Sequence, residues 1–333
     1  MKKLNLTSVA VAALIALSVV ACRKDRGNQP SVIINPDATP QEFVANNGPK
    51  VQAKQINASS LPQTVTLAGG TKITFPAGSL NISGAPATGT ATVNVIEVLK
   101  RSDVIKFGSN TNHISGAPLQ SDGFIYVDVK VNGVSVDRNL AAPMRIEIPA
   151  KRAGFTNIWE GVNQGGAPLQ PGADAQMAWA APRQANGQGG GKEVPPVGGF
   201  YSFDFGTTGW VNTDIFYSYN NPKTTVRVDL INNPGGLSSF HSYSGETYVF
   251  FCAKGANVVS QLYTVDGPNR VKSYDNVMPV GVEGKLLSFS IKDGKYYLAV
   301  QETTITANQV ASLTLAQVTQ ADVQAAISSL DNY

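Results

Sequence analysis

Alternation of apolar and polar side chains is the feature that most limits what this chain can fold into. It is clearest over residues 124–131, where four aliphatic residues at every second position fall on one side. A period of two is typical of a half-buried β-strand. Asn132-Gly133 follows directly, and an Asn-Gly pair between alternating runs predicts a hairpin because both turn residues need positive φ. The sequence therefore predicts antiparallel strands in this region.

Similar patterns recur in the second half of the chain. Leu287, Phe289 and Ile291 alternate with serines, and Asp293-Gly294 then predicts a second hairpin. The run from 248 to 252 is apolar at every position, as expected of a central strand covered on both faces. Charged residues make up only 15% of the chain, which also holds 32 glycines, and this balance favours strands and turns over helices. We therefore predict a mostly β protein, with two β-sandwich-like domains in tandem and a short C-terminal helix.

The helix is predicted at the end of the sequence. Thr319-Gln320-Ala321-Asp322 resembles a capping box in which Asp takes the place of Glu or Gln. Val323, Ile327 and Leu330 then follow at i, i+4 and i+7, which places them on one face of a helix. This face is expected to pack on the second domain.

The first 22 residues have the pattern of an export signal. Two lysines precede an apolar stretch from Leu6 to Val20, and Ala21-Cys22 follows. Val19-Val20-Ala21-Cys22 resembles the lipobox of bacterial lipoproteins, which implies cleavage after residue 21 and lipid on the Cys22 thiol. The alternative is an ordinary secretory leader that contains a cysteine. Because Arg23, and not Asp, follows the cysteine, the resemblance implies an outer-membrane destination, on either the periplasmic or the cell-surface face.

Composition divides the remaining chain into four segments. Residues 22–50 are rich in Pro, Asn and Gln and are predicted to be a flexible tether. Residues 51–150 are predicted to form the first β domain, and 151–199 an irregular Gly/Pro-rich connection. Residues 200–333 are then the second β domain, which ends in the helix.

Two stretches resemble a known group of proteins. Residues 69–80, Gly-Gly-Thr-Lys-Ile-Thr-Phe-Pro-Ala-Gly-Ser-Leu, together with 89–95, resemble the start of ZU5-like β domains. Residues 209–217 look like the Gly-Trp-Ile-Asn-Cys-Asp-Arg-Phe signature of uncharacterised Gram-negative surface lipoproteins with such a domain, but Thr213 and Ile215 replace the Cys and Arg. The resemblance implies a ZU5-like domain over 51–150 and carries no catalytic residue with it.

The aromatic and polar residues within 209–217 are predicted to support the fold. Trp210 is predicted to be a core anchor, and the alternative is a platform for a ligand. Asn212 and Asp214 are predicted to cap a turn, and the alternative is that they join a cation site.

The residues needed for several common chemistries are missing or isolated. With Lys2 and Lys3 in the leader, 24 of the 26 basic side chains remain against 23 acidic ones, so nothing predicts nucleic-acid binding. His113 and His241 are the only histidines, which are too few for a typical zinc site, and neither lies in a catalytic motif. Glu97, Glu147 and Glu160 have no evident carboxylate partner. We predict no catalytic residue, no cofactor and no metal, and we expect Cys252 to be a buried thiol.

The aromatic residues are the remaining candidates for recognition. Trp159 and Trp179 lie in polar, Gly-rich sequence and are candidate ligand contacts, while the alternative buries them at the seam between the domains or at one end of a sheet. Tyr243, Tyr296 and Tyr297 are further candidates for contact with a ligand. The expected function is that of a non-enzymatic envelope lipoprotein that binds or scaffolds a glycan or an envelope protein, attached to the membrane by lipid. The alternatives are a glycan- or peptide-acting hydrolase and an assembly subunit of an envelope complex.

Overall fold

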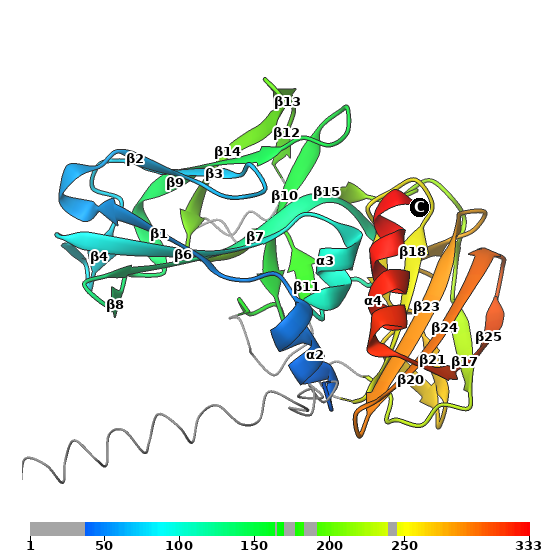
Figure 1. The fold of residues 1–333 in the computed structure, drawn as a ribbon. Helices are drawn as coiled ribbons and strands as arrows, with labels where there is room; N and C mark the ends of the chain where they lie inside the picture. Colours follow the sequence, from blue (N-terminus) through cyan, green and yellow to red (C-terminus); the bar gives the residue numbers. More distant parts are fainter. Residues whose placement is uncertain (1–36, 164, 170–176, 183–191, 239–244) are drawn as a thin grey trace, which may run out of the picture. The chain divides into compact units, whose positions relative to one another are not determined.

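Strands dominate the structure, a computed structural model that describes residues 37–163, 165–169, 177–182, 192–238 and 245–333. Within this part the chain is mostly β, with two β-sandwich-like domains in tandem and a short C-terminal helix (Figure 1). The fold class predicted from the sequence is confirmed. The predicted signal peptide and Cys22 lie outside the described residues.

The first sandwich consists of an eight-stranded sheet and a five-stranded sheet. The larger sheet contains, in spatial order, β1 (Gln52–Asn57), β6 (Thr90–Val98), β7 (Leu119–Val131), β15 (Gly209–Phe216), β10 (Thr156–Val162) and β11 (Ala178–Ala180), with β8 (Val134–Ser135) beside β7 and β12 (Glu193–Val194) beside β10. The smaller sheet contains β13 (Pro196–Val197), β14 (Phe200–Thr207), β9 (Asn139–Pro149), β3 (Lys72–Phe75) and β2 (Gln63–Thr66). A separate short pair, β4 (Asn81–Ile82) and β5 (Ala85–Pro86), and the 3-10 turn η2 (Ala58–Ser60) complete it.

The alternating residues of β7 form one side of this sandwich's core. The four aliphatic residues at positions 125, 127, 129 and 131 are all buried, in one cluster with Met144, Ile146 and Ile148 of the other sheet. Asn132 and Gly133 have φ values of 50° and 84°, and β8 pairs back on β7 after them. The predicted strand, its buried face and its hairpin are therefore confirmed.

Glu97 of β6 lies close to Gly69, one of the two glycines that precede β3. Its carboxylate accepts hydrogen bonds from the backbone N–H of Gly69 at 2.7 Å and of Thr71 at 3.3 Å. A Cβ added to Gly69 would lie 2.7 Å from Glu97 Cδ and 2.4 Å from Leu99 Cδ1. A side chain at position 69 would have to displace Leu99 or the Glu97 carboxylate that accepts these hydrogen bonds, so the close approach favours glycine, which is an architectural role.

The second sandwich pairs a five-stranded sheet with a four-stranded one. The five-stranded sheet contains β19 (Val259–Gln261), β18 (Thr247–Ala253), β23 (Glu283–Lys292), β24 (Lys295–Thr304) and β26 (Ala316–Val318). The other contains β20 (Thr264–Gly267), β21 (Arg270–Lys272), β17 (Arg227–Ile231) and β25 (Val310–Thr314), and β17 and β25 are parallel. A short pair, β16 (Lys223–Thr224) and β22 (Met278–Pro279), lies beside them.

Strand β18 contributes to two cores at once. Val249, Phe251 and Ala253 are buried inside the second sandwich, whereas Tyr248, Phe250 and Cys252 are buried on the opposite face of the sheet. Successive side chains of a strand point to opposite faces, so an all-apolar strand requires both faces to be covered. The predictions of a central strand and of a buried Cys252 are both confirmed.

The outer face of this sheet is covered by the C-terminal helix and belongs to a core that both sandwiches share. Helix α4 (Gln320–Ser329) continues into the 3-10 turn η3 (Leu330–Asn332), and Val323, Ile327 and Leu330 are buried as predicted. The shared core also contains Phe124, Trp159, Trp179 and Trp210 of the first sandwich. Residues of the second sandwich in it include Tyr248, Phe250 and Phe289.

The capping box of α4 allows a prediction about stability. Thr319 Oγ1 accepts a hydrogen bond from Asp322 N–H at 3.2 Å, and Asp322 Oδ2 accepts one from Thr319 N–H at 2.9 Å. Thr319→Ala is expected to lower the free energy of unfolding by about 1 kcal/mol, because one N-terminal N–H of the helix loses its partner. Denaturant unfolding would measure this, with Thr319→Ser, which keeps the hydroxyl, as the control. Equal losses in both variants would contradict the role of the cap.

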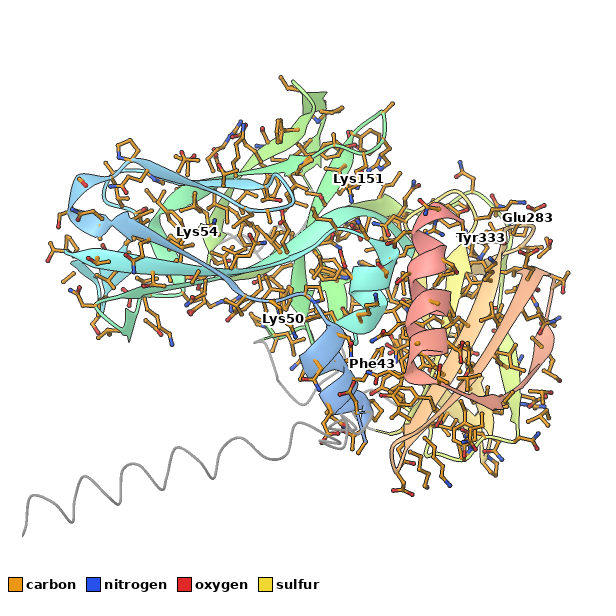
Figure 2. All side chains as sticks on the ribbon, viewed as in Figure 1. Phe43, Lys50, Lys54, Lys151, Glu283 and Tyr333 are labelled. Atoms are coloured by element: carbon orange, nitrogen blue, oxygen red, sulfur yellow. The ribbon has the colours of Figure 1, made fainter. Side chains whose placement is uncertain are left out.

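The last part of the predicted tether contains a helix. Helix α2 (Pro40–Asn47) begins after Thr39, whose Oγ1 accepts from Glu42 N–H at 3.2 Å. Phe43 is fully buried, with its ring centroid 5.9 Å from that of Phe289 (Figure 2). The prediction of a flexible tether is therefore wrong for residues 37–50. The signal was a Thr-Pro pair, which places an N-cap before a proline at the first helical position.

The predicted boundary between the domains is also wrong. Strands β10, β11, β12 and β13 lie within residues 151–199, which were predicted to be irregular. Strands β14 and β15 lie in the region assigned to the second domain but complete the two sheets of the first. The first sandwich thus continues to Phe216. These pairings join residues about 60 to 90 positions apart, which no local pattern reveals.

Candidate functional site

A polar pocket lies where the two sandwiches meet, and we call it the junction pocket. Its volume is about 420 Å³. The side chains that determine its chemistry are Lys100, Arg101, Lys151, Asn257 and Asp331. The first three follow the ends of β6 and β9 in the first sandwich, whereas Asn257 precedes β19 and Asp331 follows α4. Both sandwiches therefore contribute to its wall.

Two of the charged groups are held in place by hydrogen bonds. Arg101, the first residue of helix α3 (Arg101–Lys106), donates from Nη1 to the Ala253 carbonyl oxygen at 2.6 Å and from Nη2 to the Tyr333 carbonyl oxygen at 2.8 Å. Asp331 accepts from Ser102 N–H at 2.9 Å and from the Ser102 hydroxyl at 2.7 Å. These bonds link the two sandwiches, so the wall of the pocket is fixed before any ligand arrives.

Lys100 and Lys151 form fewer side-chain hydrogen bonds than Arg101 and Asp331. Lys151 Nζ donates to the Leu99 carbonyl oxygen, and desolvation by the surrounding protein lowers the pKa of Lys151. The ammonium of Lys100 forms no hydrogen bond or ion pair with any residue that the structure describes. In Figure 2, Lys151 lies on the first sandwich and Tyr333 on the second. The pocket is thus lined by two ammonium groups, those of Lys100 and Lys151, with N–H donors that form no hydrogen bond to any described residue.

A buried polar network lies beside the pocket and is connected to it through Asn257. Asn257 Nδ2 donates to the Ser121 carbonyl oxygen at 2.9 Å, and Ser121 N–H donates to the Asn257 carbonyl oxygen at 2.9 Å. The Ser121 hydroxyl donates to Asn212 Oδ1 at 3.1 Å, and Asn212 Nδ2 donates to Asp214 Oδ2 at 2.6 Å. The register of β7 and β15 shifts between Thr213 and Asp214, so that Asp122 bulges out of the ladder.

Burial changes the acidity of both aspartates in this network. Asp214 is fully buried, and desolvation raises the pKa of its carboxyl to about 8. Desolvation also raises the pKa of Asp122, to about 6, against the opposing effect of Arg152, whose guanidinium lies 2.9 Å from the Asp122 carboxylate. Burial therefore favours the neutral form of the Asp214 carboxyl. The two carboxyl groups interact, but neither is exposed to a cleft where a substrate could reach it.

The two tryptophans predicted as ligand contacts are core residues. Trp159 is 4% exposed, and its Nε1 donates to the Asp214 carbonyl oxygen at 2.9 Å. Trp179 is completely buried, and its Nε1 donates to the Asn110 carbonyl oxygen at 3.0 Å. The prediction of ligand contact is wrong for both, because their rings fill the shared core. Burial at the seam between the domains, the alternative, is what the structure shows.

The predictions for residues 209–217 have mixed outcomes. Trp210 is buried in the shared core, as predicted. Asn212 and Asp214 do not cap a turn, because they lie within strand β15 and bond to each other. A cation site at these residues is not found either: no cluster of three or more metal-ligating side chains occurs in the described part of the chain.

The other candidate residues that the structure describes pack against, or form hydrogen bonds with, neighbouring parts of the fold. Tyr296 is buried and donates its hydroxyl to the Asp37 carbonyl oxygen at 3.1 Å, and Tyr297 is half-buried. His113 packs its ring against Trp159 and Phe216, with centroids 5.2 and 5.0 Å apart. Tyr243 and His241 lie outside the described residues. Among the glutamates, Glu160 pairs with Arg138 at 2.6 Å and Glu147 accepts from the Ser202 hydroxyl at 3.3 Å.

The junction pocket was not predicted from the sequence. One signal was present: in a chain with few charges, Lys100-Arg101 and Lys151-Arg152 each begin two residues after a strand ends, β6 at Val98 and β9 at Pro149. Nothing local shows that these two strand ends converge on one pocket. No protein-family model, curated protein or solved structure matches the chain.

Proposed function

We propose that this protein is a non-enzymatic binding module, anchored to the outer membrane by lipid on Cys22. The observation that carries the binding role is the junction pocket, whose polar wall is contributed by both sandwiches and fixed by hydrogen bonds between them. A preformed concave site with a few fixed polar groups is typical of small-ligand recognition, because little ordering entropy is lost on binding.

The proposed membrane attachment is supported by the leader and by the short length of chain between Cys22 and the first described residue, Asp37. Cys22 follows an apolar stretch with the lipobox pattern, and the described fold starts at Asp37. Fifteen residues can span at most about 50 Å, so an anchor at Cys22 keeps the folded part near the bilayer. No helix in the described residues is long and apolar enough to cross a membrane. Each buried methylene of an acyl chain adds about 0.8 kcal/mol to membrane affinity, and several chains together hold firmly.

Replacement of Cys22 tests the anchor. Cys22→Ser is expected to leave the leader uncleaved by the lipoprotein peptidase and to remove the protein from the outer-membrane fraction. The matched control is Cys252→Ala, which changes the buried cysteine and should leave fractionation unchanged. Fractionation followed by mass spectrometry of the N-terminal peptide would measure both. A Cys22→Ser chain that is processed normally and stays with the outer membrane would refute the proposal.

The binding role is tested separately from the anchor. The purified lipoprotein, crosslinked in intact cells, is expected to retain a small ligand or glycan at the junction pocket. Crosslinks that instead map to one protein partner over a broad surface would favour an assembly subunit. Protease treatment of intact cells then distinguishes the cell-surface face from the periplasmic one.

A further inference from the structure

The junction pocket has more hydrogen-bond donors than acceptors. An ammonium carries three N–H donors. Lys151 uses one of them on the Leu99 carbonyl oxygen, and Lys100 uses none on any described residue. The Ser328 hydroxyl, also in the pocket wall, already accepts a hydrogen bond from Lys106 Nζ at 3.0 Å, so its own O–H remains available. The pocket therefore offers donors to a ligand that accepts.

The carboxylates near the pocket already accept hydrogen bonds or form an ion pair within the protein. Asp331 accepts two hydrogen bonds from Ser102. Asp103 accepts backbone hydrogen bonds at Leu99 and Lys100, and Asp122 is paired with Arg152. Asp103, Asp122 and Asp331 attract Lys151 electrostatically, and Asp103 also attracts Lys100. None of the three accepts a hydrogen bond from either ammonium among the described residues, so the N–H donors that Lys100 and Lys151 do not use on the protein can bind an anion.

We propose that the junction pocket binds a phosphate group through the ammonium groups of Lys100 and Lys151, which names the ligand class of the binding module proposed above. Lysine binds phosphate as a concentrated point charge, and charge-assisted hydrogen bonds are about twice as strong as neutral ones. The guanidinium of Arg101 adds positive potential, although its hydrogen bonds go to Ala253 and Tyr333. A volume of about 420 Å³ fits a phosphate ester with a small body and not a folded polymer.

Phosphate titration tests this proposal on the full lipoprotein in neutral detergent. Inorganic phosphate, followed by calorimetry at low ionic strength, is expected to bind saturably at one site. Lys100→Glu/Lys151→Glu should weaken binding at least tenfold. The matched control is Lys54→Glu/Lys295→Glu, which makes the same change in net charge away from the pocket and should weaken binding less than threefold. If the first pair lowers the melting temperature, Lys100→Gln/Lys151→Gln replaces it.

Two further titrations distinguish the source of the phosphate. Glycerol phosphate represents a soluble ester, and dihexanoyl phosphatidylglycerol below its micelle concentration represents a lipid headgroup, with dihexanoyl phosphatidylcholine as the zwitterionic control. A preference for either anion that the pocket variants abolish supports the proposal and assigns the source. The proposal is overturned if no saturable binding occurs, or if both pairs of variants weaken binding equally. Neither result would alter the membrane fractionation of Cys22→Ser, so failure of this inference is distinguishable from failure of the anchor.

Discussion

Replacement of Trp179 by alanine is expected to lower the free energy of unfolding by about 3–5 kcal/mol. The side chain is completely buried in the shared core, and its ring centroid lies 4.9 Å from that of Phe124. The variant would lose this packing and leave a cavity, and the Asn110 carbonyl oxygen would lose the hydrogen bond from Nε1. Because the shared core also contains residues of the second sandwich, both sandwiches should unfold at a lower denaturant concentration.

Circular dichroism during urea unfolding would measure this effect. Val197→Ala is the control, because Val197 is 70% exposed and its truncation should change the free energy of unfolding by less than about 0.5 kcal/mol. A Trp179→Ala variant as stable as the wild type, but with reduced retention on a polysaccharide gel, would restore the interpretation of Trp179 as a ligand contact.

The buried Asp214 is expected to make the protein less stable as the pH rises. Its pKa is about 8 in the folded state against 3.8 as the ordinary value, so the folded chain holds a proton that the unfolded chain has released. A raised carboxyl pKa means that its stabilising effect is complete below about pH 4 and is lost progressively up to about pH 8. At roughly 1.4 kcal/mol per pKa unit, the loss over the whole window is at most about 6 kcal/mol. Asp122, with a pKa of about 6, acts in the same direction over the lower part of the window.

Asp214→Asn isolates this contribution. The amide is neutral at every pH and close in shape, so the fall in stability between pH 5 and pH 8 should be smaller than in the wild type by a few kcal/mol. Asp204→Asn, which removes an exposed carboxylate, controls for the loss of one charge. Unfolding free energies at several pH values would give the slopes. Parallel curves for Asp214→Asn and the wild type would mean that Asp214 is ionised in the folded protein.

Local patterns predicted the elements of this fold well. The alternation in β7 and the turn residues Asn132-Gly133 depend only on neighbouring positions, and both were predicted correctly. The same holds for the capping box of α4 and for the apolar strand β18. Strand β7 must bury one face and β18 both faces, the hairpin needs positive φ at its two turn residues, and the helix needs an N-cap. These demands are visible within ten residues of sequence.

The assignment of elements to domains could not be predicted in this way. Strand β15 pairs with β7 across about 90 residues, and β14 pairs with β9 across about 60. Such pairings are determined by how whole sheets pack together, and no pattern in the neighbouring sequence indicates them. The Pro- and Gly-rich composition of 151–199 suggested a linker, but the described residues of this range include strands β10, β11, β12 and β13. Trp159 and Trp179 suggested a binding surface for the same reason, since their polar neighbours in sequence are not their neighbours in space.

The junction pocket depends on the same long-range arrangement. Lys100 and Lys151 are separated by about 50 residues, and Asn257 and Asp331 belong to the other sandwich. Each residue alone has the appearance of an ordinary charged or polar side chain near the end of a strand or helix. These residues can act together on a ligand only because the fold brings them to one pocket.

The shared core has a consequence for how this architecture can be inherited. Either sandwich, separated from the other, would present an uncovered aromatic surface to water, since Trp179 and Trp210 on one side and Phe250 and Phe289 on the other are covered by the junction. Exposed apolar surface of that kind promotes aggregation during folding. Transfer of one sandwich alone into another protein would therefore be strongly disfavoured. The two sandwiches are expected to be inherited together as one unit.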